Sequence, residues 1–169
     1  PEREVSSTSA PAAHQRRTQP ELLAYPRYNV IGVWDVGAPK TIHFNAHYDV
    51  VPVSGHWRHG DPFNPVVEKG WIYGRGSADM KGAIASIVFA LRSLRASGVK
   101  PNLNVEVSFT ADEETDSALG TGWIARHGKL KADYAVVGEG GEEDVICCGH
   151  NGVVWLNVRV HGRGIALRR

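Results

Sequence analysis

The sequence predicts an α/β fold, with a mixed, mostly parallel sheet and flanking helices. One observation is an amphipathic helix around Ile84–Leu94, in which apolar residues repeat at three- and four-residue spacing. A second is a series of short runs rich in β-branched and aromatic residues on both sides of that helix, which is typical of strands. The third is that acidic residues directly follow several of these runs. Open α/β sheets carry their ligand chemistry at such strand ends.

The elements before the helix can be taken in order. Residues 1–24 contain Ser, Ala, Pro, Gln and charges without an aromatic residue, so we expect a disordered or loosely docked arm. Strands are predicted at Tyr28–Trp34 and Thr41–Ala46. Residues 52–65 are rich in Pro, Gly, His and Asp and predict a surface loop. A short strand is expected around Val66–Tyr73 before the helix begins.

Alternation in the second strand assigns its residues to two faces. One face is apolar and the other polar, with Ile42, Phe44 and Ala46 on the first and His43 and Asn45 on the second. After the helix, which Gly98 and Pro101 end, the same alternation runs through Asn104–Ala111.

The remaining elements are short. A helix is expected around Trp123–His127, a buried strand at Tyr134–Gly138 and a further strand at Val153–Val160. Residues 163–169 show no pattern that predicts an element.

Composition excludes several classes of partner. The chain has 169 residues, about one domain, and 19 basic against 18 acidic residues. This balance gives no reason to expect binding to nucleic acid or to an anionic membrane surface. No apolar run approaches the roughly 20 residues of a membrane span. Cys147 and Cys148 are adjacent, so we expect reduced core thiols in a cytoplasmic protein rather than a disulfide.

One histidine and five acids each follow a predicted strand: His47, Asp49, Asp79, Glu113, Glu114 and Glu139. Parallel strands of one sheet would bring all six to the same rim. Five carboxylates crowded there would raise one another's pKa unless positive charge lay among them. Two divalent cations would supply that charge, and the ligand set suits zinc, with cobalt or manganese as alternatives. Asp79, in the middle of the set, is the natural bridge between two ions.

Each residue taken alone also has an ordinary structural interpretation. Asp79 before a helix is as readily a helix cap, and His47 alone is more often a hydrogen-bonded core histidine than a ligand. The acidic run 112–114 is compatible with a solvated turn. We expect the other histidines in the body of the chain to be ordinary core or surface residues: His43, His56, His59, His127 and His150.

Four motifs extend the argument beyond spacing. They are HYDVVP at 47–52, GRGSADMKG at 74–82, DEE at 112–114 and GE at 138–139. In order and spacing they resemble the M20 metallopeptidase family, over about Tyr28 to Gly162. The family includes acetylornithine deacetylase, succinyl-diaminopimelate desuccinylase, aminoacylase and glutamate carboxypeptidases. The resemblance implies a three-layer α/β/α fold of the zinc-exopeptidase kind.

The resemblance also implies metal ligands. His47 and Glu139 would hold a first zinc ion, Asp79 would bridge, and Glu114 would hold the second. It further implies a cis peptide bond between Asp79 and Met80.

Two further residues receive catalytic roles from the resemblance. Asp49 would orient the imidazole of His47, and Glu113 would act as the general base. The implied reaction is hydrolysis of an amide in an N-acyl amino acid or short peptide.

The resemblance also predicts an incomplete catalytic domain. Residues 25–150 would be its metal-binding part, and 151–169 would begin a truncated lid and dimerisation domain. Family members are longer, and they supply a second-zinc histidine and an oxyanion histidine that we do not find here. A longer parent would therefore be the active form and could form a homodimer through the lid. Two hypotheses remain, a partial chain of a two-zinc amidohydrolase and a metal-binding fragment without turnover.

Overall fold

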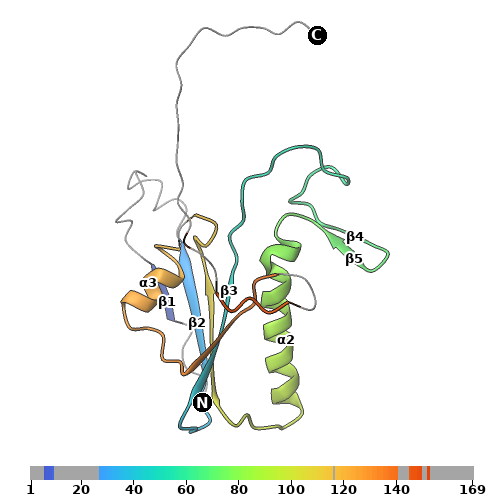
Figure 1. Cartoon of the computed structure of the whole chain (residues 1–169). Coiled ribbons are helices and arrows are strands. Elements are labelled where there is room, and N and C mark those ends of the chain that lie inside the picture. The colour runs from blue at the N-terminus through green and yellow to red at the C-terminus, as the bar shows by residue number, and fades with distance from the viewer. Residues whose placement is uncertain (1–5, 10–26, 116, 141–144, 150–151, 153–169) are drawn as a thin grey trace, which may run out of the picture.

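The structure is a computed structural model that describes residues 6–9, 27–115, 117–140, 145–149 and 152. Its strands and helices, shown in Figure 1, are β1 (Ser6–Ser9), β2 (Tyr28–Trp34), β3 (Thr41–His47), β4 (Val66–Glu68), β5 (Trp71–Tyr73), α2 (Gly82–Ala96), β6 (Asn104–Thr110), α3 (Thr121–Arg126) and β7 (Tyr134–Val137). A helical turn, Ser77–Lys81, precedes α2.

Five of the strands form one sheet in the order β1-β2-β6-β3-β7. β3 runs parallel to both β6 and β7, whereas β2 is antiparallel to β6 and to β1. Four of these five strands therefore point the same way and β2 alone is reversed, which confirms the predicted mixed, mostly parallel sheet. Figure 1 shows α2 and α3 on opposite sides of this sheet, so the described residues form three layers.

The strands of this sheet lie close to their predicted positions. β2 matches its predicted bounds, and β3, β6 and β7 each differ by one residue at the carboxyl end. The register between β3 and β6 is continuous from Thr41 opposite Asn104 to His47 opposite Thr110.

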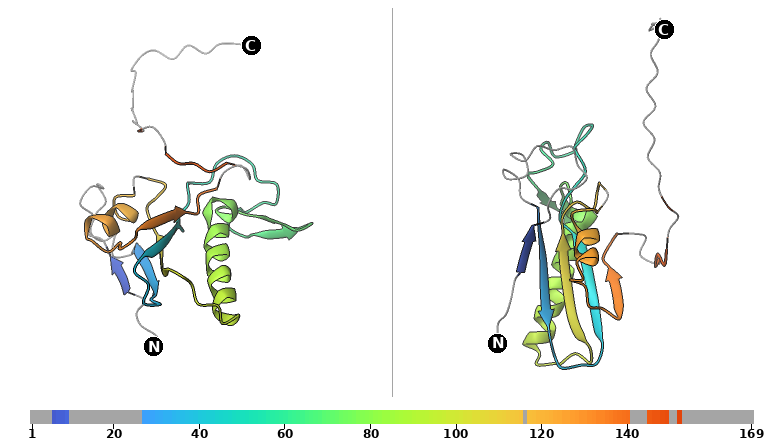
Figure 2. Two further views of the ribbon diagram at one scale, coloured as in Figure 1. Left: turned by 60° about the horizontal axis from the view of Figure 1, so that its bottom comes forward. Right: turned by 90° about the vertical axis from the view of Figure 1, so that its left-hand side faces the viewer.

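The single strand predicted at Val66–Tyr73 is wrong. The segment folds back on itself as the β4–β5 hairpin, a separate two-stranded sheet. Its turn residues, Lys69 and Gly70, have φ angles of 53° and 83°, a combination that favours tight two-residue hairpins. Figure 2 shows this hairpin projecting beside α2, away from the main sheet.

Two expectations concern the ends of the chain, which are only partly described. Of the predicted arm, Ser6–Ser9 is described, and it pairs with β2 at the edge of the sheet. The rest of residues 1–24 and the predicted strand Val153–Val160 lie outside the described residues.

The two cysteines differ from their prediction. Cys147 and Cys148 are free and exposed, so the expectation that they belong to the core is wrong. None of the described helices has the length and apolar character needed to cross a membrane.

The two faces of the sheet are covered differently. On the α3 side, the polar residues His43, Asn45, Glu106 and Ser108 are all buried. Asn45 Nδ2 there donates to Ser108 Oγ at 2.8 Å and lies 3.3 Å from Oγ1 of Thr121, the first residue of α3. On the α2 side, Ala46 is buried, but Ile42 and Phe44 are only partly buried and line a groove of about 670 Å³. Alternation therefore predicted which residues share a face, but the polar face is the better covered one.

Candidate metal centre

Four chain segments bring the candidate residues together at one edge of the sheet. The carboxyl ends of the parallel strands β3, β6 and β7 meet there, because parallel strands end on the same side. His47 is the last residue of β3, and Tyr48 N donates to Thr110 O at 2.9 Å, which joins the ends of β3 and β6. The acids that follow β6 and β7 are Glu113, Glu114 and Glu139.

Asp79 reaches this edge by a different route from the predicted one. It follows β5, which belongs to the separate hairpin and not to the main sheet. It lies in the helical turn that precedes α2, and both this turn and α2 contact β3. The peptide bond between Asp79 and Met80 is cis, as the resemblance implies.

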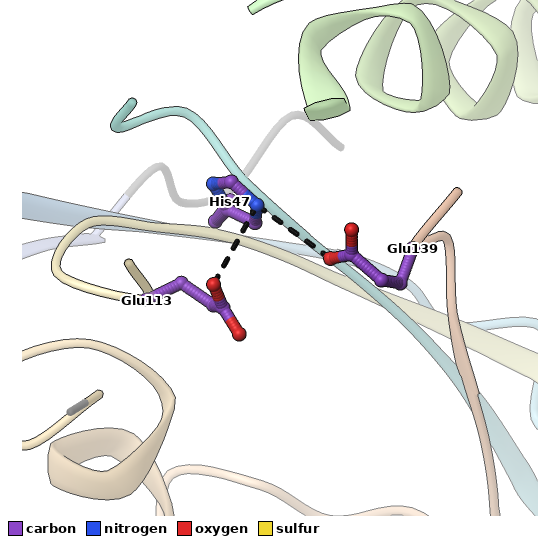
Figure 3. Close-up of side chains that lie close together, drawn as sticks. All are labelled: His47, Glu113 and Glu139. Atoms are coloured by element: carbon purple, nitrogen blue, oxygen red, sulfur yellow. Dashed lines mark ion pairs between the residues drawn. The ribbon is translucent and has the colours of Figure 1, made fainter. Parts of the chain in front are cut away.

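His47 lies at the centre of the cluster. Its Nε2 atom is 3.0 Å from Asp79 Oδ1, 3.6 Å from Glu139 Oε2 and 3.7 Å from Glu113 Oε2. Figure 3 shows the last two carboxylates facing the same ring nitrogen from two sides. The imidazole side chain is only 1% exposed, whereas these three acidic side chains are 44–55% exposed. The cluster therefore consists of a buried histidine with its acids open to solvent.

Asp49 contacts the other side of the ring and also the neighbouring loop. His47 Nδ1 is 3.1 Å from Asp49 O and 3.4 Å from Asp49 Oδ1. A proton on Nδ1 satisfies this side and leaves the Nε2 lone pair free for a cation. The two carboxylate oxygens of Asp49 also accept hydrogen bonds from Glu113 N and Glu114 N, each at 3.2 Å. The resemblance implied the first contact but not the second.

The charges of the cluster are unbalanced. Burial lowers the pKa of His47, but the carboxylates of Asp49, Glu113 and Asp79 outweigh it, and the net pKa is raised. Burial raises the pKa of Glu113, and repulsion from Glu139 adds to this. Burial likewise raises the pKa of Glu139, together with repulsion from Asp79. Positive charge placed among these carboxylates would remove the repulsion.

The donor atoms fit a divalent cation. Two groups each place their donors within 4.8 Å of one another, His47 with Glu113 and Glu139, and His47 with Asp79 and Glu114. Nε2 has one lone pair, so His47 can bind a cation in only one of these groups at a time. They also include Glu113 among the donors, whereas the resemblance makes it the base. We favour the base role, because the exposed Glu113 side chain can turn away when a cation takes its place beside His47.

Sequence reasoning missed the residues that support the segment carrying Glu113 and Glu114. Arg27 and Asn29, at the start of β2, contact residues 111–119 through side-chain hydrogen bonds. No motif or spacing in the sequence marks them, because their partners lie more than 80 positions away.

Comparison with solved structures shows the same fold. An M20 family metallo-carboxypeptidase from Sulfolobus solfataricus superposes with a TM-score of 0.60 at 31% identity, over 69% of this chain and 27% of that one. Human carnosine dipeptidase 1 superposes with a TM-score of 0.62 at 22% identity, over 80% of this chain and 29% of that one. At that lower identity the second likeness concerns the fold alone.

Sequence comparison identifies the family. A succinyl-diaminopimelate desuccinylase of Buchnera aphidicola is 39% identical over 137 residues, which is 75% of this chain and 36% of that protein. The chain thus spans about a third of the length of the curated relatives that it matches. The model of peptidase family M20/M25/M40 matches residues 43–165, which include His47 and every acid of the cluster. The chain belongs to peptidase family M20/M25/M40.

Proposed function

We propose that this chain forms the metal-binding part of an amidohydrolase that uses two zinc ions to hydrolyse an N-acyl amino acid or a short peptide. The observation that carries the proposal is the arrangement around His47, whose buried Nε2 faces carboxylates from three different segments within 3.7 Å. A buried group that only stabilises the fold would pair the charge of one histidine with that of one acid. This surplus of negative charge is instead typical of a cation site.

The proposed ligands divide between two ions. His47, Asp79 and Glu139 would hold one, and Asp79 and Glu114 would contribute to the other, with cobalt or manganese as possible substitutes. Bound zinc lowers the pKa of water and polarises a carbonyl group.

Glu113 carries the proton that must pass from the attacking water to the leaving amine. Glu113 takes a proton from the attacking water, whose oxygen bonds to the amide carbon. As the carbon–nitrogen bond breaks, Glu113 returns that proton to the leaving amine. Burial raises the pKa of Glu113, which makes its carboxylate a stronger base than a fully solvated one. Asp49 holds His47 in the tautomer that presents Nε2 to the site.

The substrate class is part of the proposal. A desuccinylase and a metallo-carboxypeptidase are similar to this chain at more than 30% identity, and both names describe cleavage of an amide beside a carboxylic acid. We therefore propose a small N-acyl amino acid or peptide as substrate. The proposal includes a cytoplasmic location and a homodimer for a longer parent. No observation favours the alternative, a fragment that binds metal without turnover.

The metal site can be tested by titrating the 169-residue chain with Co²⁺ by calorimetry and visible absorption. Wild type should bind, and Asp79→Asn should weaken binding at least tenfold. The matched control is Asp61→Asn, in an exposed loop where Oδ1 only accepts from Phe63 N. If wild type retains no cobalt, zinc or manganese, the proposal fails.

Turnover should be tested on a longer protein that contains this chain. Its substrates would be N-succinyl and N-acetyl amino acids and dipeptides. Glu113→Gln should lower kcat by roughly 10²–10⁴ and leave metal affinity intact, because it removes a base and not a ligand. Glu114→Gln should instead weaken metal binding. Unchanged kcat in the zinc-loaded Glu113→Gln variant would rule out the assigned base.

A further inference from the structure

Glu113 and Glu114 belong to a loop whose shape depends on one buried acid. We call residues 112–115 and 117–119 the acidic loop. Asp112 begins it with a φ of 70°, and its side chain is 1% exposed. Its Oδ1 accepts hydrogen bonds from Arg27 Nη1 at 2.8 Å and Thr115 Oγ1 at 2.7 Å. Its Oδ2 accepts from Leu119 N at 3.1 Å, so one carboxylate ties the first residue of the loop to the last.

Asn29 in β2, and Arg27 just before β2, contact the residues at both ends of this loop. Asn29 is fully buried, and its Oδ1 accepts a hydrogen bond from Ala111 N at 3.3 Å. Its Nδ2 donates to Leu119 O at 2.9 Å. Arg27, whose side chain is 20% exposed, reaches the same loop through Asp112. These contacts are 82–90 positions apart in sequence. They form a clamp, which we call the β2 clamp and define as Arg27 and Asn29.

The acidic loop needs to be held because its acids face other acids. Glu113 Oε2 and Glu139 Oε2 lie 3.7 and 3.6 Å from the same nitrogen, His47 Nε2, so these two carboxylates repel each other. A loop without anchors would relax by moving these carboxylates toward solvent. The clamp opposes this from the buried side, through contacts that do not involve the proposed ligands.

We propose that Arg27 and Asn29 are positioning residues, which hold the acidic loop so that Glu113 and Glu114 face His47 before a cation binds. This inference rests on the proposed function for its metal site, but the loop geometry that it describes exists without metal. Preorganisation of this kind reduces the ordering that a ligand must impose when it binds.

The test uses the 169-residue chain and two measurements. Amide hydrogen exchange at Glu113 and Glu114 reports loop order without metal, and Co²⁺ titration reports affinity. Arg27→Met should speed exchange at these two amides at least tenfold, while amides in the middle of β3 exchange as in wild type. Cobalt affinity should fall about 10–100-fold, as is typical when a residue that supports a ligand is lost.

Further variants keep the test informative. Arg27→Met combined with Asp112→Asn removes both charges if the single variant does not fold. Thr115→Val removes one donor to Asp112, leaves the ion pair and should give a smaller change in the same direction. Arg27→Lys keeps the positive charge but lacks the planar guanidinium group, so its amide exchange and cobalt affinity should lie between those of wild type and Arg27→Met. The matched control is Arg126→Met, because Arg126 Nη2 also donates to this loop, at Ala118 O, but from the exposed side.

The outcomes separate the two proposals. Folded Arg27 or Thr115 variants with wild-type exchange at Glu113 and Glu114 and wild-type cobalt affinity would overturn the clamp. A comparable effect of Arg126→Met would also overturn it, since any loop contact would then suffice. If wild type binds no cobalt but the clamp variants speed exchange, the proposed function fails and the β2 clamp stands as the support of the loop.

Discussion

Two histidines on β3 lie on the same face, four residues apart, and are equally buried, at 3% and 1% exposure. His43 Nδ1 meets Glu106 Oε1 at 2.7 Å, and its Nε2 meets Ser108 Oγ at 2.8 Å. One tautomer satisfies all three groups, and one acid balances one histidine. His47 instead has three carboxylates around Nε2 and a fourth beside Nδ1. Surplus charge open to solvent, and not burial, separates a candidate site from a structural cluster.

The structural cluster also shows why geometry alone does not make a site. Ser108, His43 and Glu106 are linked by hydrogen bonds in the way that the serine, histidine and acid of a serine-hydrolase triad are linked. Ser108 has no exposed surface, so a substrate cannot reach its hydroxyl. The three residues join β3 to β6 on the face that α3 covers.

The prediction with the largest expected effect removes the acid that pairs with His43. Glu106→Leu leaves His43 without its acid in a buried place, so we expect the free energy of unfolding to fall by about 3–5 kcal/mol. Urea denaturation measures this directly. Glu68→Leu is the control, because Glu68 lies on the hairpin with a side chain 34% exposed and should cost under about 1 kcal/mol. A loss below that value for Glu106→Leu would show that His43 does not depend on its partner.

The second prediction adds positive charge at the unbalanced histidine. Zinc at 100 times its dissociation constant should raise the free energy of unfolding by about 2.7 kcal/mol, because the cation binds the folded chain. Thermal denaturation with and without zinc measures the shift. At the same zinc concentration, Asp79→Asn should reduce this shift by about half or more, because its binding is at least tenfold weaker. Ser108→Ala should keep the full shift. A melting temperature that does not respond to zinc in wild type would contradict the distinction between the two histidines.

The third prediction concerns the hydroxyl in the balanced cluster. Ser108→Ala leaves His43 Nε2 and one amide proton of Asn45 without their shared partner, so we expect a loss of about 1–2 kcal/mol. The loss should appear in the urea midpoint with an unchanged slope. Cobalt affinity should equal that of wild type. A drop in affinity at full folding would mean that the two histidine clusters are coupled.

The prediction with the smallest expected effect is a gain in stability, whereas the substitutions around His43 should reduce stability. In the metal-free chain, Glu113→Gln removes one of the mutually repelling carboxylates, so stability should rise by up to about 0.5 kcal/mol. The effect is small because the side chain is 44% exposed and solvent screens it. The gain should shrink in high salt, which urea denaturation at two ionic strengths would show. If this substitution lowered stability, Glu113 would stabilise the chain as Glu106 does, and the contrast between the two histidines would not hold.

The elements that the sequence predicted well have strong local signals. Alternation fixed the bounds of β2, β3 and β6 to within one residue, and threefold to fourfold spacing located α2. The hairpin at residues 66–73 was missed because its turn is Lys-Gly, a weaker signal than Asn-Gly or Asp-Gly. Asp79 was assigned to a strand end of the main sheet, since spacing alone does not show which sheet a strand joins.

The sequence by itself determined the kinds of residue at the rim and their order, because donor types and strand ends are local properties. Only the tertiary structure decided which histidine carries surplus charge, which face of the sheet is buried, and that Arg27 supports Asp112. Hydrogen bonds and charge repulsion act over a few ångströms. The partners of the β2 clamp are 82–90 residues apart in the chain, so only folding brings them within that range.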